Sequence, residues 1–310
     1  MADFIEVVGL EPVLMSAGIT TSESDIETLY QELSGSPAHA QSVSQIESQV
    51  AAYFELIKIP DDVTLYDQLL LSLREKDVVA TFNWDPLLLQ SYRRNVGVRR
   101  LPKILFLHGS ISVGICLDCR TKGCLHLRCS KCGRHFQPTR LLYPIKEKDY
   151  ISDPFIAGEW DELKRNLERA YIVTIIGYRA PSTDAAAVDL LRQVWDRNET
   201  RELAQVEVVD IRSEREVFQT WEPFIVREHY HITSSIHTTI LGRYPRRSCD
   251  AFAWATLQNS PWPVNEMPSF GTLRELQNWV QPLLEEEIAL DERKRAFSGR
   301  KTEDIRQMPM

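Results

Sequence analysis

Five of the six cysteines of this 310-residue chain lie within one short stretch. Two Cys-x-x-Cys pairs, separated by nine residues, are formed by Cys116, Cys119, Cys129 and Cys132. Each pair can reach one ion from a tight turn, and two such turns complete the tetrahedron that zinc prefers. Because four thiolates leave no open coordination position, the spacing predicts a structural rather than a catalytic zinc site. Cys124 and His126 lie inside the gap, and either of them is an alternative ligand.

Polar side chains follow two apolar runs that are rich in β-branched residues. Asn83 and Asp85 end one run, and His108 ends the next. The carboxyl ends of parallel strands meet at one edge of a sheet, and ligands bind at that edge. A histidine titrates near neutrality and suits the role of a general base. The alternatives are structural: Asn83 and Asp85 can cap the helix that begins near Pro86, and His108 can be a buried, hydrogen-bonded histidine.

The elements that would position these residues alternate between apolar runs and helical patterns, which is typical of a parallel α/β sheet. Strands are expected over 12–18, 77–85, 101–110, 140–144, 170–178 and 206–211. Helices are expected over 24–34, 43–57, 64–76, 86–94, 159–169 and 272–292, the last with a kink or break at Pro282. We therefore predict a Rossmann-type parallel sheet with helices on both faces and a small zinc-binding insert over about 112–140. This domain would occupy residues 1–220, and a mostly helical extension would occupy 221–310.

The ordered set of motifs resembles sirtuins. It consists of TFNWD at 81–85, LHGS at 107–110, the paired cysteines, and a strand that ends in IIGY at 175–178 with P-x-T-D after it. These variants are closest to the bacterial sirtuin-like branch, several members of which cleave NAD as effectors of antiphage defence. A partial match to the sirtuin phosphate loop lies at 16–21, where Ser16 replaces the first glycine. Phe82 stands where sirtuins keep a glutamine, and the Asp-Phe-Arg that follows their loop is missing.

The resemblance implies NAD as ligand and a role for each matching residue. Asn83 would position the ribose or the attacking water, Asp85 would hold the nicotinamide carboxamide, and His108 would act as the general base. The cofactor-binding residues would be Ser16, Ala17, Gly18, Ile19 and Thr20 at the phosphates, Thr81 at its strand end, Gly177 where the backbone approaches the cofactor, and Asp210 at the adenosine ribose. Small residues and a helix N-terminus suit a pyrophosphate. The alternatives are an ordinary turn at 16–21 and packing roles for Trp84 and Tyr178.

Three functions stay open at this point. The first is an NAD hydrolase that cleaves the nicotinamide–ribose bond, as an antiphage effector does. The second is an NAD-dependent protein-lysine deacylase, against which the loop departures count. The third is a catalytically inactive module that binds NAD or a protein partner. Residues 221–310 are the candidate surface for a partner or a homo-oligomer.

Composition sets further limits. The formal net charge of −8 disfavours a general nucleic-acid binder, because such a chain repels phosphate backbones. No apolar run is long enough for a transmembrane helix, and clustered cysteines without a signal sequence favour a reducing, cytoplasmic location. The run Glu285, Glu286 and Glu287 is expected to be a solvated helix face. His229 and His231 alternate as if on a surface strand, with a metal site as the alternative.

Overall fold

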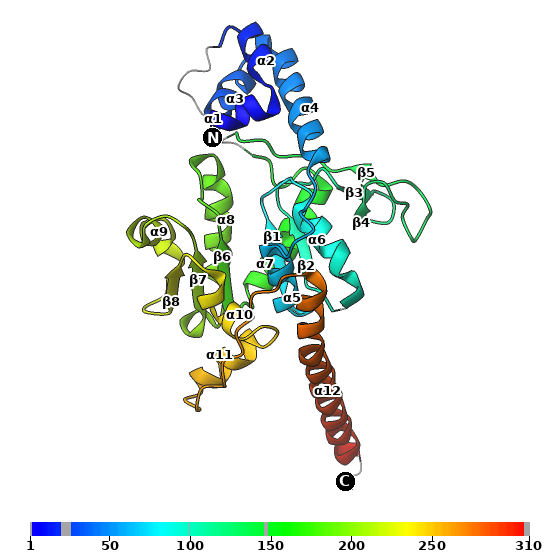
Figure 1. Cartoon of the computed structure of the whole chain (residues 1–310), viewed down its shortest axis with the longest axis vertical. Coiled ribbons are helices and arrows are strands. Elements are labelled where there is room, and N and C mark those ends of the chain that lie inside the picture. The colour runs from blue at the N-terminus through cyan, green and yellow to red at the C-terminus, as the bar shows by residue number, and fades with distance from the viewer. Residues whose placement is uncertain (1, 20–25, 99, 146–147, 307–310) are drawn as a thin grey trace. The chain divides into compact units, whose positions relative to one another are not determined.

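The computed structural model describes residues 2–19, 26–98, 100–145 and 148–306. The chain forms two compact units, whose elements are labelled in Figure 1. The first unit holds residues 1–59, 78–90 and 103–236, and the second holds 60–77, 91–102 and 237–310. All strands of the described residues lie in the first unit. The domain boundary expected near residue 220 stays a prediction.

Five strands of the first unit pair in parallel, so the predicted α/β class is confirmed. They are β1 (Val78–Thr81) with β2 (Lys103–Phe106), and β6 (Ile172–Ile176), β7 (Gln205–Val209) and β8 (Tyr230–Thr233) in that order. The parallel strands are divided between two sheets, and no further strand of the described residues pairs with β1 or β6. Val, Ile and Leu dominate these strands, as is typical of parallel sheets that are covered by helices.

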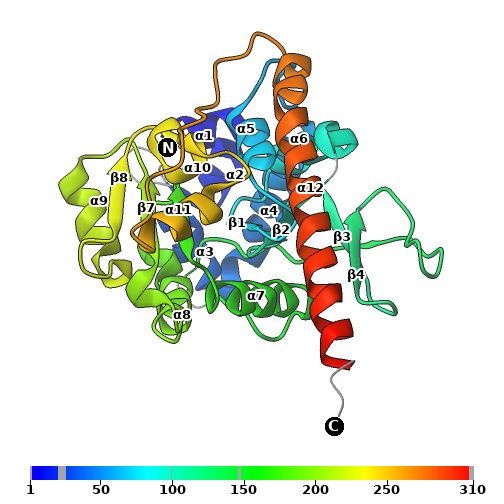
Figure 2. The same ribbon diagram turned by 90° about the horizontal axis from the view of Figure 1, so that it is seen from below.

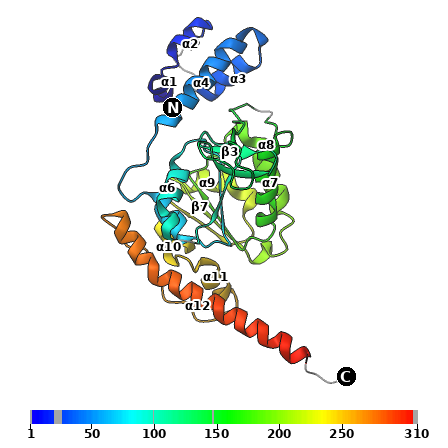
Figure 3. The ribbon, with the colours of Figure 1, turned by 90° about the vertical axis from the view of Figure 1, so that its right-hand side faces the viewer.

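Three helices cover these strands. They are α7 (Pro154–Leu167), α8 (Ala185–Trp195) and α9 (Glu214–Trp221). Figure 3 shows α7 and α8 running beside one another, and α7 also contacts β2. The shared core of this part contains the following buried residues: Leu167, Val194, Trp195, Ala204, Val206, Val208, Val217, Trp221 and Phe224. Sequence signals fix the helix starts, since Asp153 accepts hydrogen bonds from the first turn of α7 and Ser213 forms a capping box with Glu216 in α9.

The N-terminal segment is helical where a strand was expected. Its helices are α1 (Ala2–Val8), α2 (Glu11–Ser16), α3 (Ile26–Ser34) and α4 (Ala40–Leu56). The prediction of a strand over 12–18 is therefore wrong. Leu10, Val13 and Leu14 follow helical spacing, and all three are buried against the neighbouring helices. Pro12 lies in the first turn, where a helix tolerates proline, so this short apolar stretch forms a helix.

The cysteine stretch forms a small antiparallel sheet of its own. It contains β3 (Val113–Cys116), β4 (Thr121–Cys124) and β5 (Gln137–Pro138), with β3 in the middle. The expected bounds of a zinc-binding insert, about 112–140, stay a prediction. The strand expected over 140–144 does not form, because this segment pairs with no other strand and contributes only single hydrogen bonds, such as Leu142 N to His108 O.

The second unit is helical. Its helices are α5 (Leu65–Ser72), the later part of α6 (Leu87–Asn95), α10 (Ile240–Arg243), α11 (Ser248–Thr256) and α12 (Leu273–Arg306).

Short 3-10 helices of the two units lie at Pro37–His39, Val96–Val98, Ser182–Asp184, Arg201–Leu203, Glu222–Phe224 and Ile236–Thr238. Figure 2 shows α12 as one continuous helix, so the break expected at Pro282 does not occur. Among the described residues, no helix has the length and apolar character that a membrane span requires.

A buried ion pair fastens α12 within the second unit. Glu287 is 5% exposed, and its carboxylate accepts from the fully buried Arg246 at 2.8 Å (Nε) and 2.6 Å (Nη2). Arg246 also donates to Leu73 O at 2.7 Å, which ties it to the end of α5. The expectation that Glu285, Glu286 and Glu287 form a solvated face is wrong for Glu287, because consecutive helical positions point in different directions and this one points inward.

Glu287→Gln is expected to lower the free energy of unfolding by about 3 kcal/mol, because it leaves the Arg246 guanidinium buried without a counter-charge. Glu286→Gln is the matched control: its side chain is 54% exposed and pairs with Arg247, so a change of at most about 1 kcal/mol is expected. Urea unfolding of both full-length variants measures the difference. Equal losses in the two variants would contradict a special role for the buried pair.

Candidate functional site

The carboxyl ends of β1 and β2 bring His108 next to the residues that follow β1. Leu107 N donates to Thr81 O at 2.9 Å, which continues the parallel ladder up to His108. The Phe82 ring meets the His108 ring edge-on at 4.7 Å between centroids. Phe82 also stacks on Tyr178 at 4.4 Å with an interplanar angle of 11°. The ends of β1, β2 and β6 therefore converge on one buried place.

His108 is buried, at 5% exposure, beside polar groups to which the sequence analysis gave no role. Its Nε2 lies 3.3 Å from the Tyr150 hydroxyl and 3.8 Å from Asp184 Oδ1. Burial lowers the pKa of His108 to about 4, an effect that the Asp184 carboxylate opposes and the Lys148 ammonium reinforces. At neutral pH the imidazole is consequently uncharged and able to accept a proton, as a general base must be.

Asp184 is the centre of the polar cluster around His108. Its Oδ1 accepts from Lys148 Nζ at 2.6 Å, and its Oδ2 accepts from the Tyr178 hydroxyl at 2.9 Å. Burial and this carboxylate raise the pKa of Tyr178, so the hydroxyl remains a donor. Lys148 also donates to Thr183 O at 2.7 Å. Tyr178 therefore packs through its ring, as the packing alternative has it, and also donates through its hydroxyl.

The two other predicted catalytic residues follow β1, and among the described residues their printed partners are local. Asn83 is exposed, and its backbone N–H donates to Thr81 Oγ1 at 3.0 Å. Asp85 Oδ1 accepts from Leu87 N at 2.9 Å, which caps α6 as the structural alternative anticipated. Burial raises the pKa of Asp85. Neither residue has a hydrogen bond to His108, and their catalytic roles stay predictions.

Two predicted cofactor-binding residues follow β6 and β7: Gly177 is exposed, and the Asp210 carboxylate is already paired with an arginine. Gly177 is exposed and has a φ of +61°, with open space where a Cβ would lie. Asp210 accepts from Arg212 Nε at 3.0 Å and from Arg212 Nη2 at 2.8 Å. Arg212 holds the pKa of Asp210 below its usual value. A ribose hydroxyl would have to compete with this arginine for the carboxylate.

The segment expected to cradle phosphates ends a helix instead of joining a strand to a helix. Ser16 is the last residue of α2 and donates its hydroxyl to Val13 O at 2.7 Å. Ala17 and Gly18 follow it as helix-terminating residues, with Gly18 at a φ of +78°. Ile19 packs against the N-terminal core, and Thr20 lies outside the described residues. The expectation of a strand-to-helix loop is therefore wrong, because a helix precedes this segment. Contact of these residues with a ligand stays a prediction.

Gly109 shapes the turn that follows His108. It has a φ of +83°, and an added Cβ would lie 2.0 Å from Arg140 O. Gly109→Ala is therefore expected to lower the free energy of unfolding by about 3 kcal/mol, because both the backbone conformation and the close approach disfavour a side chain. Gly177→Ala is the control, since its φ is also positive but nothing lies within 4 Å; about 1 kcal/mol is expected. Thermal or urea unfolding compares the two, and losses of the same size would refute the close-packing argument.

The four predicted zinc ligands come together. The sulfur atoms of Cys116, Cys119, Cys129 and Cys132 all lie within 4.8 Å of one another. A zinc ion with bonds of 2.3 Å requires neighbouring sulfurs about 3.8 Å apart, and Cys116 Sγ lies 3.4 Å from Cys132 Sγ. The donor set thus fits a tetrahedral zinc ion. Cys124 and His126 are outside this group, and among the described residues no group with metal-ligand geometry contains His229 or His231.

A lysine of the zinc module reaches the strand that carries His108. Lys122 on β4 donates to Ile104 O at 2.7 Å and to Glu159 at 2.6 and 2.7 Å. Glu159 on α7 in turn accepts from Phe106 N at 2.8 Å. Two backbone groups of β2 are satisfied by these side chains rather than by a further strand. The zinc module and α7 consequently fix the strand that ends at His108.

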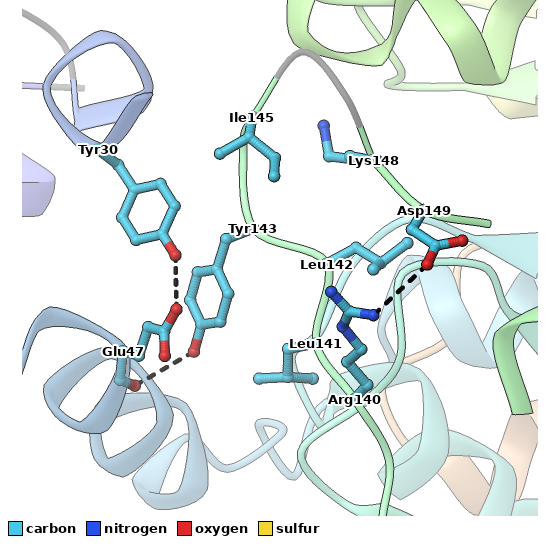
Figure 4. A pocket seen from close by; sticks show the side chains of 9 residues that line it. All are labelled: Tyr30, Glu47, Arg140, Leu141, Leu142, Tyr143, Ile145, Lys148 and Asp149. Atoms are coloured by element: carbon cyan, nitrogen blue, oxygen red, sulfur yellow. Dashed lines mark hydrogen bonds and ion pairs between the residues drawn. The ribbon is translucent and has the colours of Figure 1, made fainter. Parts of the chain in front are cut away.

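A cavity of about 370 Å³ lies between α3, α4 and the segment 140–149. Figure 4 shows Tyr30 and Tyr143 on one side and Arg140 and Asp149 on the other. Tyr30 donates to Glu47 Oε1 at 2.5 Å, and Tyr143 donates to Glu47 O at 3.3 Å. Lys148 also lines the cavity, and its ammonium pairs with Asp184, the carboxylate that lies near His108. None of the residues predicted to bind the cofactor lines this cavity.

Comparisons with known proteins were made for the sequence and for the structure. No protein-family model and no curated protein matches the sequence. Among solved structures, a Sir2 homologue in complex with NAD is 16% identical with a TM-score of 0.40, over 77% of this chain and 87% of that one. A Sir2 in complex with the inhibitor EX-527, 2'-O-acetyl-ADP-ribose and a deacetylated p53 peptide is 14% identical with a TM-score of 0.38, over 76% and 93%. A mutant Sir2 homologue in complex with ADP-ribose is 16% identical with a TM-score of 0.39, over 80% of this chain and 91% of that one. The chain is similar to Sir2 homologues.

Proposed function

We propose that this chain is a sirtuin-like enzyme that cleaves the nicotinamide–ribose bond of NAD by hydrolysis. The observation that carries the proposal is the burial of His108 where the carboxyl ends of parallel strands converge, on a strand that the four-cysteine module contacts through Lys122. This is the order of motifs for which the sequence resembles sirtuins. The proposed zinc is structural, since its four thiolates leave no position for a substrate.

In the proposed reaction, the C–N bond between nicotinamide and the ribose breaks, and a C–O bond to water forms. Neutral His108 accepts the proton of the attacking water or of a ribose hydroxyl and later returns it to solvent. A transition state that resembles an oxocarbenium ion needs orientation and polar support more than a strong nucleophile. The Asn83 side chain is exposed at the neighbouring strand end, where it is available to position the ribose or the water.

A second candidate is a catalytically inactive module that binds NAD or a partner. It is favoured by the helix α2, which ends at Ser16, so that a helix and not a strand leads into the segment expected to form the phosphate loop. The deacylase predicted as an alternative would need an acyl-lysine peptide as co-substrate. A role in antiphage defence and assembly through residues 221–310 extend the proposal on the resemblance. A cytoplasmic location extends it on the clustered cysteines.

Product analysis separates these candidates. The purified chain is incubated with NAD, with and without an acetylated lysine peptide, and nicotinamide is quantified. Release without peptide is expected, and it supports the hydrolase. Release that depends on the peptide supports the deacylase and overturns the hydrolase. No release in either condition, from a chain that binds about one zinc as a four-cysteine site implies, overturns both enzymes and favours the binding module.

A further inference from the structure

A buried ion pair lies behind His108, outside the set of residues that the sequence assigned to the site. The side chains of Lys148 and Asp184 are 2% and 8% exposed, and Lys148 Nζ lies 2.6 Å from Asp184 Oδ1. Removing two charges from water costs several kcal/mol per ion, and apolar residues often stabilise such a position as well or better. Stability alone is therefore a weak explanation for a buried ion pair. The position of this pair next to His108 indicates that it acts on the imidazole.

Asp184 is held from several sides while it faces the imidazole. Tyr178 donates to Oδ2, Lys148 donates to Oδ1, and the same Oδ1 lies 3.8 Å from His108 Nε2. The backbone carbonyl oxygen of the neighbouring Thr183 accepts a hydrogen bond from Lys148. The Thr183 hydroxyl donates to Glu27 Oε2 at 3.3 Å. These contacts fix both oxygens of the carboxylate, so its distance from His108 is defined by the surrounding residues.

We propose that Lys148 and Asp184 are positioning residues for His108: the carboxylate orients the imidazole, and the ammonium offsets the carboxylate's charge so that the imidazole stays neutral. The inference rests on the proposed function, because only a neutral His108 can accept the proton of the attacking group. Without Lys148, an uncompensated carboxylate beside Nε2 would favour the imidazolium ion. Without the carboxylate, the ammonium would disfavour that ion further.

The charged and titratable groups around His108 come from several elements. They are Lys148 and Tyr150 before α7, Asp184 and Tyr178 after β6, and Glu27 of α3, which reaches Thr183. Burial lowers the pKa of His108 most, Asp184 raises it, and Lys148 lowers it. The two members of the pair therefore act on the pKa of His108 in opposite directions, because their charges are opposite.

The test follows the imidazole resonances of the seven histidines by NMR through a pH titration of the full chain. His108 is assigned as the resonance that is missing in His108→Asn. Lys148→Met is expected to move its titration upward by about one pH unit or more, and Asp184→Asn is expected to move it downward. Lys164→Met, an exposed lysine on α7, is the control and should leave it in place. Shifts in the same direction for both variants, or no shift in correctly folded variants, would overturn the proposal.

Tyr178→Phe keeps the proposal testable if Lys148→Met does not fold. Phenylalanine preserves the stacking on Phe82 but removes the hydroxyl that stabilises the Asp184 carboxylate. An upward shift of the His108 titration is expected, and an unchanged titration overturns the inference. The titration needs no NAD, so its failure is distinct from a failure of the proposed function. Where the chain does turn over NAD, the acidic limb of kcat/KM should move in the same direction as the His108 titration.

Discussion

His108→Asn is expected to lower the rate of nicotinamide release by about 10²- to 10⁴-fold, which is the usual contribution of a general base. Asparagine is close in shape and can still form a hydrogen bond toward Tyr150, but it cannot accept a proton at neutral pH. The rate is measured at saturating NAD on protein whose circular dichroism and bound zinc match the unchanged chain. The loss should appear in kcat, because proton transfer belongs to the transition state.

His126→Asn is the matched control for this loss. His126 is exposed in the zinc module, outside the four-cysteine group, so neither the rate nor the zinc content should change. If His108→Asn unfolds the chain, the structural alternative gains support, in which His108 is only a hydrogen-bonded core residue. If it folds and keeps full activity, His108 is not the base.

Removing zinc is expected to unfold the antiparallel module formed by β3, β4 and β5. Zinc contributes about 10–16 kcal/mol to the folding of small zinc-binding peptides, and this module is only a short sheet around its thiolates. Cys116→Ser should reduce bound zinc from about one per chain to a small fraction, because Cys116 is a buried member of the group. Metal analysis and protease sensitivity of the segment 113–138 measure the result.

Cys124→Ser provides the control for the zinc site, since Cys124 lies in the same sheet but outside the group. It should keep about one zinc per chain. Loss of the module should also lower activity. Lys122 then no longer donates to Ile104 O, on the strand that leads to His108, or to Glu159 on α7. Full zinc binding by Cys116→Ser would contradict the ligand assignment.

The zinc ligands could be predicted from the sequence because their geometry is local. Each Cys-x-x-Cys pair presents two sulfurs from one turn, and only the meeting of the two turns depends on the fold. The fold also resolved the alternative between the four cysteines and Cys124 or His126. The strands β1, β2, β6 and β7 were predictable because their apolar runs are short and rich in β-branched residues, which favours a strand over a buried helix.

The short segment at 12–18 could not be predicted correctly. Seven residues of mixed apolar and small character fit a strand as well as a helix, and only the burial of Leu10, Val13 and Leu14 against the neighbouring helices decides for the helix. The same holds for Glu287, whose inward direction depends on Arg246, 41 residues away.

The cluster around His108 was only half visible in the sequence. The strand end supplied His108, and the P-x-T-D motif contained Asp184, but nothing local pairs that aspartate with Lys148, 36 residues before it. Tyr150 is likewise 42 residues from His108. Such pairs form through tertiary packing, so sequence spacing carries no signal for them.

The central claim is that the strand ends around His108 hold NAD, and the most direct test is a titration of ADP-ribose into histidine-labelled protein. ADP-ribose is the product of the proposed reaction and cannot be cleaved at the nicotinamide–ribose bond, so binding is separated from turnover. A saturable change in the His108 imidazole resonance is expected, with the exposed His126 unchanged as internal control. Absence of binding, or saturable binding that leaves His108 unperturbed, would contradict it.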